Sequence, residues 1–262
     1  MNRFEPTEEF AKWAKSFAGI DGGNMAGPIW FCGIEHGGDD NDIKTKDFKP
    51  VNKLPNWENE IERGKNFEHQ FDQKALKLYA ALLEKEIAGY KDIAEVKGAF
   101  APNSDVFKLN LYPLAFKNTA DGHWCDKFFE RTGIPTKEIY RAWCQTNRFN
   151  LFHDIVSQNN QTLRLIVCAG VGHSMEFLMA FGTVNDIHVE MKRSRIPDPD
   201  KKMANGLSFH WIILNDKRTV LAVVPFFGHW KYCLNSDKRI KVFGDEIRTV
   251  CSKNLEDNWL PS

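Results

Sequence analysis

The spacing of apolar residues predicts helices and strands that alternate along most of the chain. Apolar positions three and four residues apart, as at Phe10, Trp13, Ala14 and Phe17, follow one face of a helix. Thr7 stands where its side chain can cap the start of that helix. The same period predicts helices over 7–19, 67–82, 136–148, 151–158, 173–182 and 240–250.

Five other runs are rich in aliphatic, β-branched and aromatic residues, and they predict strands. These runs lie at 28–34, 105–116, 163–170, 207–214 and 219–225. The first and third are apolar at almost every position, which is typical of strands covered by helices on both faces of a sheet. We therefore expect an α/β fold, a three-layer α/β/α sandwich around a central, mostly parallel sheet, as one domain over residues 1–262.

Composition and charge narrow the possible partners. The 35 Lys and Arg residues balance 35 Asp and Glu residues, so a nucleic-acid partner would need a local basic patch. The 6 cysteines are scattered without a CxxC pair, which argues against a zinc ribbon or a clustered iron–sulfur site, and we expect no cofactor. No apolar leader and no apolar run of about 18 residues occurs. We expect a cytoplasmic protein with no membrane partner and no obligate protein partner.

Polar residues and glycines gather where the first predicted strand ends, in the stretch GIEHGGDD. Ligands of parallel α/β sheets bind at the carboxyl ends of strands, so this corner is a candidate site. Glycines there permit close approach of the backbone to a ligand, although a polar turn would have the same composition. The carboxylates of Glu35, Asp39, Asp40 and Asp42 also suit a divalent metal.

Two later strand ends carry further candidate residues. Asn110 ends the run FKLN, where its amide can satisfy nearby backbone or bind the edge of a planar ligand. The stretch PFFGHWKY places large apolar side chains beside a lysine. Such wedges beside basic groups suit a protein that enters a DNA duplex while holding its phosphates. The basic run at 191–195 is interpreted as a solvated loop that could also hold phosphate.

Taken in order, GIEHGGDD, FKLN, LIVCAG and PFFGHW resemble the landmarks of the uracil-DNA glycosylase superfamily over residues 27–250. The resemblance implies a DNA glycosylase that flips out uracil or a modified base and hydrolyses its N-glycosidic bond. It implies Glu35 as the acid that orients the water and His229 as the donor to the departing base. Substrate binding is then expected at Gly33, Ile34, His36, Gly37, Asp39, Asn110, Tyr112 and Phe226. DNA binding is expected at Trp230, Lys231, Tyr232, Leu234 and Lys238.

The chain also departs from the superfamily's pattern. His36 stands where those enzymes have a proline, and His229 lies further along its motif than the pattern implies. The polar loop at 36–55 adds carboxylates, so a larger or more polar base than uracil is a credible substrate, in repair or in defence against foreign DNA. Two alternatives stay open. One is a metal-dependent phosphoesterase or nuclease using Glu35, Asp39 and Asp40, and the other is a catalytically inactive DNA-binding relative.

Overall fold

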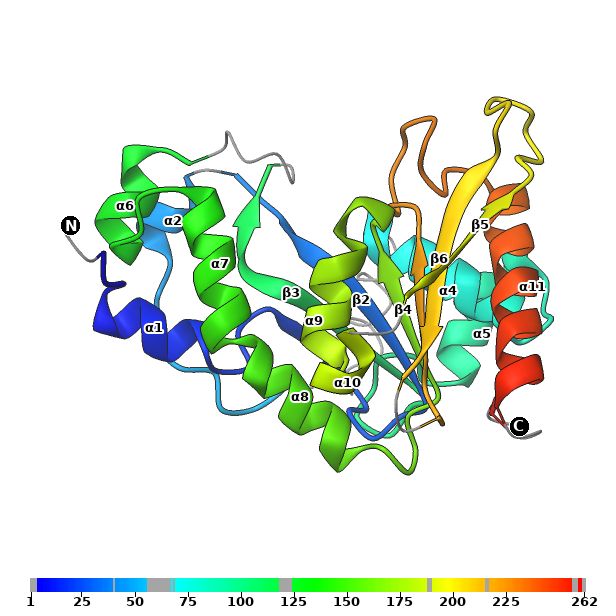
Figure 1. Ribbon diagram of the computed structural model, residues 1–262, viewed down its shortest axis with the longest axis horizontal. Coiled ribbons are helices and arrows are strands. Elements are labelled where there is room, and N and C mark those ends of the chain that lie inside the picture. The colour runs from blue at the N-terminus through cyan, green and yellow to red at the C-terminus, as the bar shows by residue number, and fades with distance from the viewer. Residues whose placement is uncertain are drawn as a thin grey trace.

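A seven-stranded mixed sheet runs through the molecule (Figure 1). The computed structural model describes residues 4–39, 41–55, 67, 69–117, 124–187, 190–214, 217–255 and 259–260. In order across the sheet the strands are β1 (Ile20–Gly23), β3 (Val106–Phe116), β2 (Ile29–Gly37), β4 (Leu165–Ala169), β7 (Val220–Val224), β6 (Leu207–Ile213) and β5 (Lys192–Ile196). The four central strands are parallel to one another. β1 runs antiparallel to β3, β6 runs antiparallel to β7, and β5 runs antiparallel to β6. The predicted α/β class with a centrally parallel sheet is confirmed.

All five predicted strands are present, and two edge strands were not predicted. The first, β1, lies in a stretch with two glycines at positive φ, Gly22 and Gly23, which hides any strand periodicity. The second, β5, is the sequence KRSRI, whose side chains are exposed at three of five positions. The interpretation of the basic run as a loop was therefore wrong. An edge strand with charged side chains lacks the apolar alternation on which the prediction depended.

Six helices begin within three residues of their predicted starts, whereas α5 and α6 were not predicted. The longer ones are α1 (Glu8–Ala14), α4 (Gln70–Leu82), α5 (Tyr90–Val96), α6 (Asp126–Thr132), α7 (Lys137–Asn147), α8 (Phe149–Gln158), α9 (Ser174–Phe181) and α11 (Asp237–Asn254). Short turns form α2 (Asp42–Thr45), α10 (Val184–Ile187) and the 3-10 helices η1 (Ile87–Gly89) and η2 (Val171–His173). The Thr7 hydroxyl accepts a hydrogen bond from the Phe10 amide, which confirms the predicted cap. Among the described residues, no helix is both long and apolar enough to cross a membrane.

Helices cover both faces of the sheet, and each face has its own hydrophobic core (Figure 1). Trp30 of β2 packs into the core beneath α1, α7, α8 and α9, while its neighbour Phe31 packs into the core beneath α4, α5 and α11. Successive side chains of a strand point to opposite faces. A strand buried on both faces must be apolar throughout, which explains the continuous apolar run of β2.

Candidate functional site

The carboxyl ends of β2 and β4 form a topological switch point, because the chain leaves these neighbouring strands toward opposite sides of the sheet. From β2 the chain continues to β3, which lies on the side of β2 away from β4. From β4 the next of the four parallel strands is β7, which lies on the side of β4 away from β2. Open α/β sheets bind ligands at such a point. Two cavities meet here, the first of about 530 Å³ and the second of about 390 Å³. Both are lined by Glu35, His36, Gly37, Gln70, Phe71 and Phe227.

Glu35 lines both cavities, and its carboxylate is buried. Its side chain is 3% exposed, and Oε1 accepts a hydrogen bond from Lys137 Nζ at 2.8 Å. Oε2 accepts no hydrogen bond from the described residues, and Arg141 Nη2 lies 3.8 Å from it. Burial raises the pKa of Glu35, although Lys137 and Arg141 favour the charged form. One carboxylate oxygen is thus held in place, and the other is buried beside Arg141 without a hydrogen bond from the described residues.

Lys137 is itself fully buried, and its ammonium lies 3.7 Å from the centre of the Phe116 ring. It is the first residue of α7, where the helix dipole disfavours a cation. The Glu35 carboxylate and the aromatic face offset that cost. Neither Lys137 nor Arg141 was predicted as a site residue, because nothing local in the sequence distinguishes them from solvent-facing cations of a helix.

Asn110 lies in the first cavity with its amide orientation fixed by its neighbours. Its Nδ2 lies 3.2 Å from Asp21 Oδ2 and 3.2 Å from His36 Nε2. A carboxylate only accepts hydrogen bonds, so the amide nitrogen must face Asp21. Oδ1 consequently lies over Gly33, where an added β-carbon would come within 2.3 Å of it. Gly33 lies inside β2, opposite Asn110 on β3, and not at the predicted strand end; a glycine is needed there to make room for the Asn110 amide.

His36 faces the same carboxylate, with Nε2 3.2 Å from Asp21 Oδ1. Burial lowers the pKa of His36 more than Asp21 raises it, which favours the neutral ring. Nε2 lies 3.2 Å from both the Asp21 carboxylate and the Asn110 amide nitrogen, so it donates to Asp21 when it carries the proton and accepts from Asn110 when it does not. His36 thus helps to position Asn110.

Lys108 completes the polar wall of the first cavity. Its ammonium lies 3.0 Å from Asp21 Oδ2 and 2.5 Å from Asp72 Oδ1. Burial disfavours the ammonium, yet the two carboxylates hold the pKa of Lys108 above its ordinary value. Burial also raises the pKa of Asp72. Lys108, Asp21 and Asp72 were not predicted as site residues, because they come from a strand interior, an unpredicted strand and a helix.

The loop after β7 forms the wall of the second cavity. Phe227 packs against Phe71 with ring centres 5.1 Å apart, and Phe226 fills the space over Gly170. His229 and Trp230 also line this cavity; both are exposed, Trp230 to 80%. The structure therefore brings His229, Phe226 and Trp230 to the same cavity as Glu35, Gly33 and Ile34.

Six predicted site residues line neither cavity, and two of them, Lys231 and Tyr232, are exposed directly after Trp230. Leu234 is fully buried in the core, so it is removed from the DNA-facing set. Tyr112 is also fully buried and donates its hydroxyl hydrogen to Glu176 behind the site. Asp39 is exposed, lines neither cavity and accepts hydrogen bonds from Asn41. Lys238 lies on α11 in a separate depression.

The residues proposed for a metal site do not converge. Glu35 is paired with Lys137, whereas Asp39 turns to Asn41. Within the described parts of the chain, no group of three or more His, Cys, Asp and Glu side chains could hold a metal ion. Asp40 lies outside the described residues.

No protein-family model matches the chain, and neither does any curated protein or solved structure with which it was compared. A functional proposal therefore depends on the chemistry of these cavities and on the sequence landmarks.

Proposed function

We propose that the protein is a DNA glycosylase that binds an extruded uracil or modified base in the joined cavities and hydrolyses its N-glycosidic bond. The observation that carries this proposal is the Glu35 carboxylate. It is buried at the switch point, ion-paired through Oε1, and its Oε2 accepts no hydrogen bond from the described residues. We further propose that the helices on both faces of the sheet make the three-layer α/β/α sandwich that the resemblance to the uracil-DNA glycosylase superfamily implies.

In this mechanism Glu35 Oε2 accepts a hydrogen bond from a water molecule and directs its oxygen toward the sugar C1′. As the bond from C1′ to the base nitrogen breaks, its electron pair leaves with the base, and the sugar becomes cationic. The carboxylate stabilises that charge electrostatically, and it takes the proton that the water loses as the new bond to C1′ forms. His229 is assigned as the donor that stabilises the negative charge on the departing base.

The base is held by side chains of the first cavity. Asn110 Oδ1 offers an acceptor to an N–H group of the base, since the amide nitrogen faces Asp21 and His36. The rings of Phe71 and Phe227 line both cavities and offer aromatic surface for stacking. Asp21, Asp72 and Lys108 add charged groups that an unsubstituted uracil would not need. This favours a base with a polar substituent.

Outside the cavity, Trp230 is the residue best placed to fill the gap that an extruded base leaves in the DNA stack. It is 80% exposed at the rim of the second cavity, and Lys231 and Tyr232 follow it at the surface. An apolar side chain inserted between bases stabilises the extruded state.

The test is release of free base from a panel of DNAs carrying uracil, hypoxanthine, alkylated bases and hypermodified cytosines, detected by mass spectrometry. Glu35→Gln keeps the shape of the side chain and removes its charge, and we expect the rate to fall by about 10²-fold or more. Asp39→Asn makes the same chemical change at an exposed position outside both cavities and should leave the rate unchanged. The reaction should survive EDTA. A panel that yields no free base, or equal effects of the two variants, would overturn the proposal.

A further inference from the structure

The exposed edge of the sheet carries cations without carboxylate partners. Lys192, Arg193 and Arg195 are exposed on β5, which pairs only with β6. Within the described parts of the chain, no carboxylate forms an ion pair with any of the three. Two exposed lysines elsewhere, Lys12 and Lys241, pair with Glu8 and Asp245. In a chain of zero net charge, β5 is thus a local source of positive potential.

Arg193 and Arg195 lie on one face of the sheet. They are two residues apart on a strand, a separation of about 7 Å, and their cross-strand partners are His210 and Ser208. Nδ1 of His210 lies 2.7 Å from Ser174 Oγ, at the start of α9. The face that carries the two arginines therefore adjoins the segment that follows β4, next to the second cavity.

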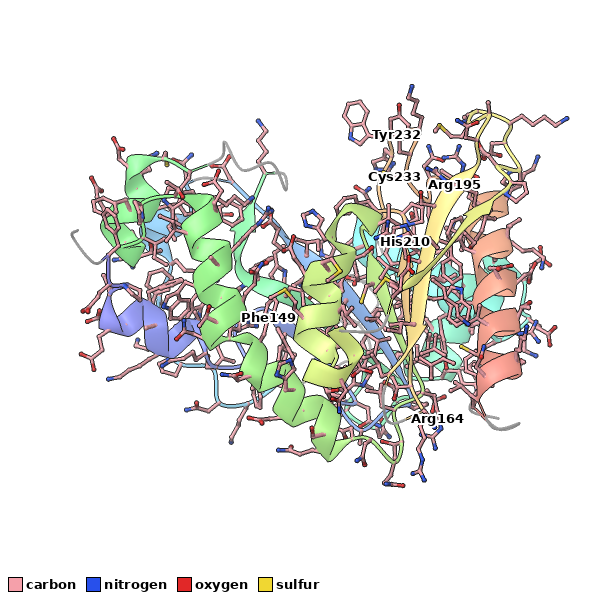
Figure 2. All side chains as sticks on the ribbon, in the orientation of Figure 1. Phe149, Arg164, Arg195, His210, Tyr232 and Cys233 are labelled. Carbon is pink, nitrogen blue, oxygen red and sulfur yellow. The ribbon has the colours of Figure 1, made fainter. Side chains whose placement is uncertain are left out.

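A buried arginine joins the end of β5 to the loop that carries the exposed aromatic residues. Arg239 donates two hydrogen bonds to the Asp198 carboxylate, just beyond β5, at 2.8 and 2.6 Å. It also donates to the backbone oxygens of Lys231 and Cys233, at 2.7 and 2.9 Å. The paired guanidinium holds the pKa of Asp198 low, at about 2, so this connection stays ionised at neutral pH. Figure 2 places Arg195 and Tyr232 at the same end of the molecule.

The loop supplies aromatic surface beside these cations. Trp230 and Tyr232 are 80% and 58% exposed, and the Lys231 ammonium lies 4.8 Å from the Tyr232 ring centre. Proteins that bind nucleic-acid strands combine cations along the phosphate backbone with aromatic rings on which bases stack. The arginines of β5 and the aromatic rings of the loop that Arg239 holds provide the same combination.

We propose that β5 and the loop at 229–232 form one DNA-binding surface, in which Arg193 and Arg195 contact phosphates and Trp230 and Tyr232 stack on bases. This inference rests on the proposed glycosylase function, since the DNA bound by this surface is the strand that flanks the extruded base. It adds Arg193 and Arg195 to the DNA-facing residues. It also explains why the exposed edge strand β5 carries these cations.

The experiment measures binding of a fluorescent single-stranded oligonucleotide without a modified base, by anisotropy over a range of salt concentrations. Loss of two phosphate contacts should reduce the slope of log K against log salt by about 1.4 for a single strand. We therefore expect Arg193→Gln/Arg195→Gln to weaken binding at low salt and to flatten its salt dependence. Trp230→Ala/Tyr232→Ala should weaken binding and leave the slope unchanged, because it removes no charge.

The matched control is Lys12→Gln/Lys241→Gln, which makes the same change in net charge at two exposed and paired lysines. Equal effects of the two double variants, or no binding by the wild-type protein, would overturn the proposal. The proposal would also fail if the arginine variant bound the oligonucleotide normally but self-associated. Arg193 and Arg195 would then serve only to prevent the edge strand from pairing with another chain. Loss of binding to anionic lipid vesicles with unchanged oligonucleotide binding would assign the surface to a membrane instead.

Because the oligonucleotide carries no modified base, this result is independent of catalysis. If the surface binds as expected and no DNA in the panel releases a base, the glycosylase proposal fails alone. If base is released and the arginine variant binds normally, the surface fails alone.

Discussion

Replacing Lys137 with methionine tests whether the buried ion pair organises the site. The change keeps most of the apolar length of the side chain and removes its ammonium, so the Glu35 carboxylate loses the cation 2.8 Å away. The two side chains are 0% and 3% exposed, so solvent cannot replace the lost contact. Arg141, at 3.8 Å from the other oxygen, is too far to substitute fully.

Removal of one partner of a buried pair typically costs about 3–5 kcal/mol in the free energy of unfolding, because it leaves an uncompensated charge. Protonation of Glu35 limits the cost, because loss of the lysine raises the pKa of this carboxyl further. We expect a loss of about 3 kcal/mol at neutral pH and a smaller loss in acid. The exposed pair of Lys12 with Glu8 supplies the control, since Lys12→Met should leave the free energy of unfolding close to that of the wild type.

The assay is urea unfolding of the wild type, Lys137→Met, Glu35→Gln and the double variant, each at neutral and acidic pH. The double variant should recover part of the stability lost in Lys137→Met, because the neutral amide leaves no buried charge. If Lys137→Met unfolds within about 1 kcal/mol of the wild type, as an exposed pair would, the ion pair does not stabilise the site and the reasoning is refuted.

Three further predictions follow from the geometry of the site. Gly33→Ala places a β-carbon 2.3 Å from Asn110 Oδ1; unfolding should show a loss of about 1–3 kcal/mol, and base release should slow. Leu234→Ala should cost about 2–5 kcal/mol in stability, whereas Trp230→Ala should leave unfolding unchanged and weaken DNA binding; equal stabilities would contradict the assigned burial. Because burial raises the pKa of Glu35, its contribution to stability is present below its unfolded pKa and is lost as pH rises through its folded pKa. Base release needs the Glu35 carboxylate, so its rate should rise with pH as Glu35 ionises in the folded protein. In Glu35→Gln, the pH dependence caused by this ionisation should disappear from both the rate and the unfolding free energy.

The sequence alone predicted the central part of the fold and the corner at which the candidate site lies. Apolar runs with a strand period marked β2, β3, β4, β6 and β7. Gly33, Glu35 and Asn110 were predicted at or just after strand ends, but β2 continues to Gly37 and β3 to Phe116, so all three lie within these two paired strands. Strand period is a local property that is readable within a few residues, whereas the last residue of each strand was not.

The tertiary structure alone decided which groups surround those residues. Lys137 is separated from Glu35 by 102 residues, and Asn110 is separated from Asp21 by 89. No local pattern encodes such pairs, and β1 and β5 lacked the apolar alternation that marks a strand. The loop after β7 shows the same limit. Trp230 and Leu234 are equally apolar in the sequence, but the Leu234 amide donates to the Phe226 carbonyl as the loop closes, which buries Leu234 and leaves Trp230 exposed. Burial depends on where the chain returns, and only the folded chain determines that.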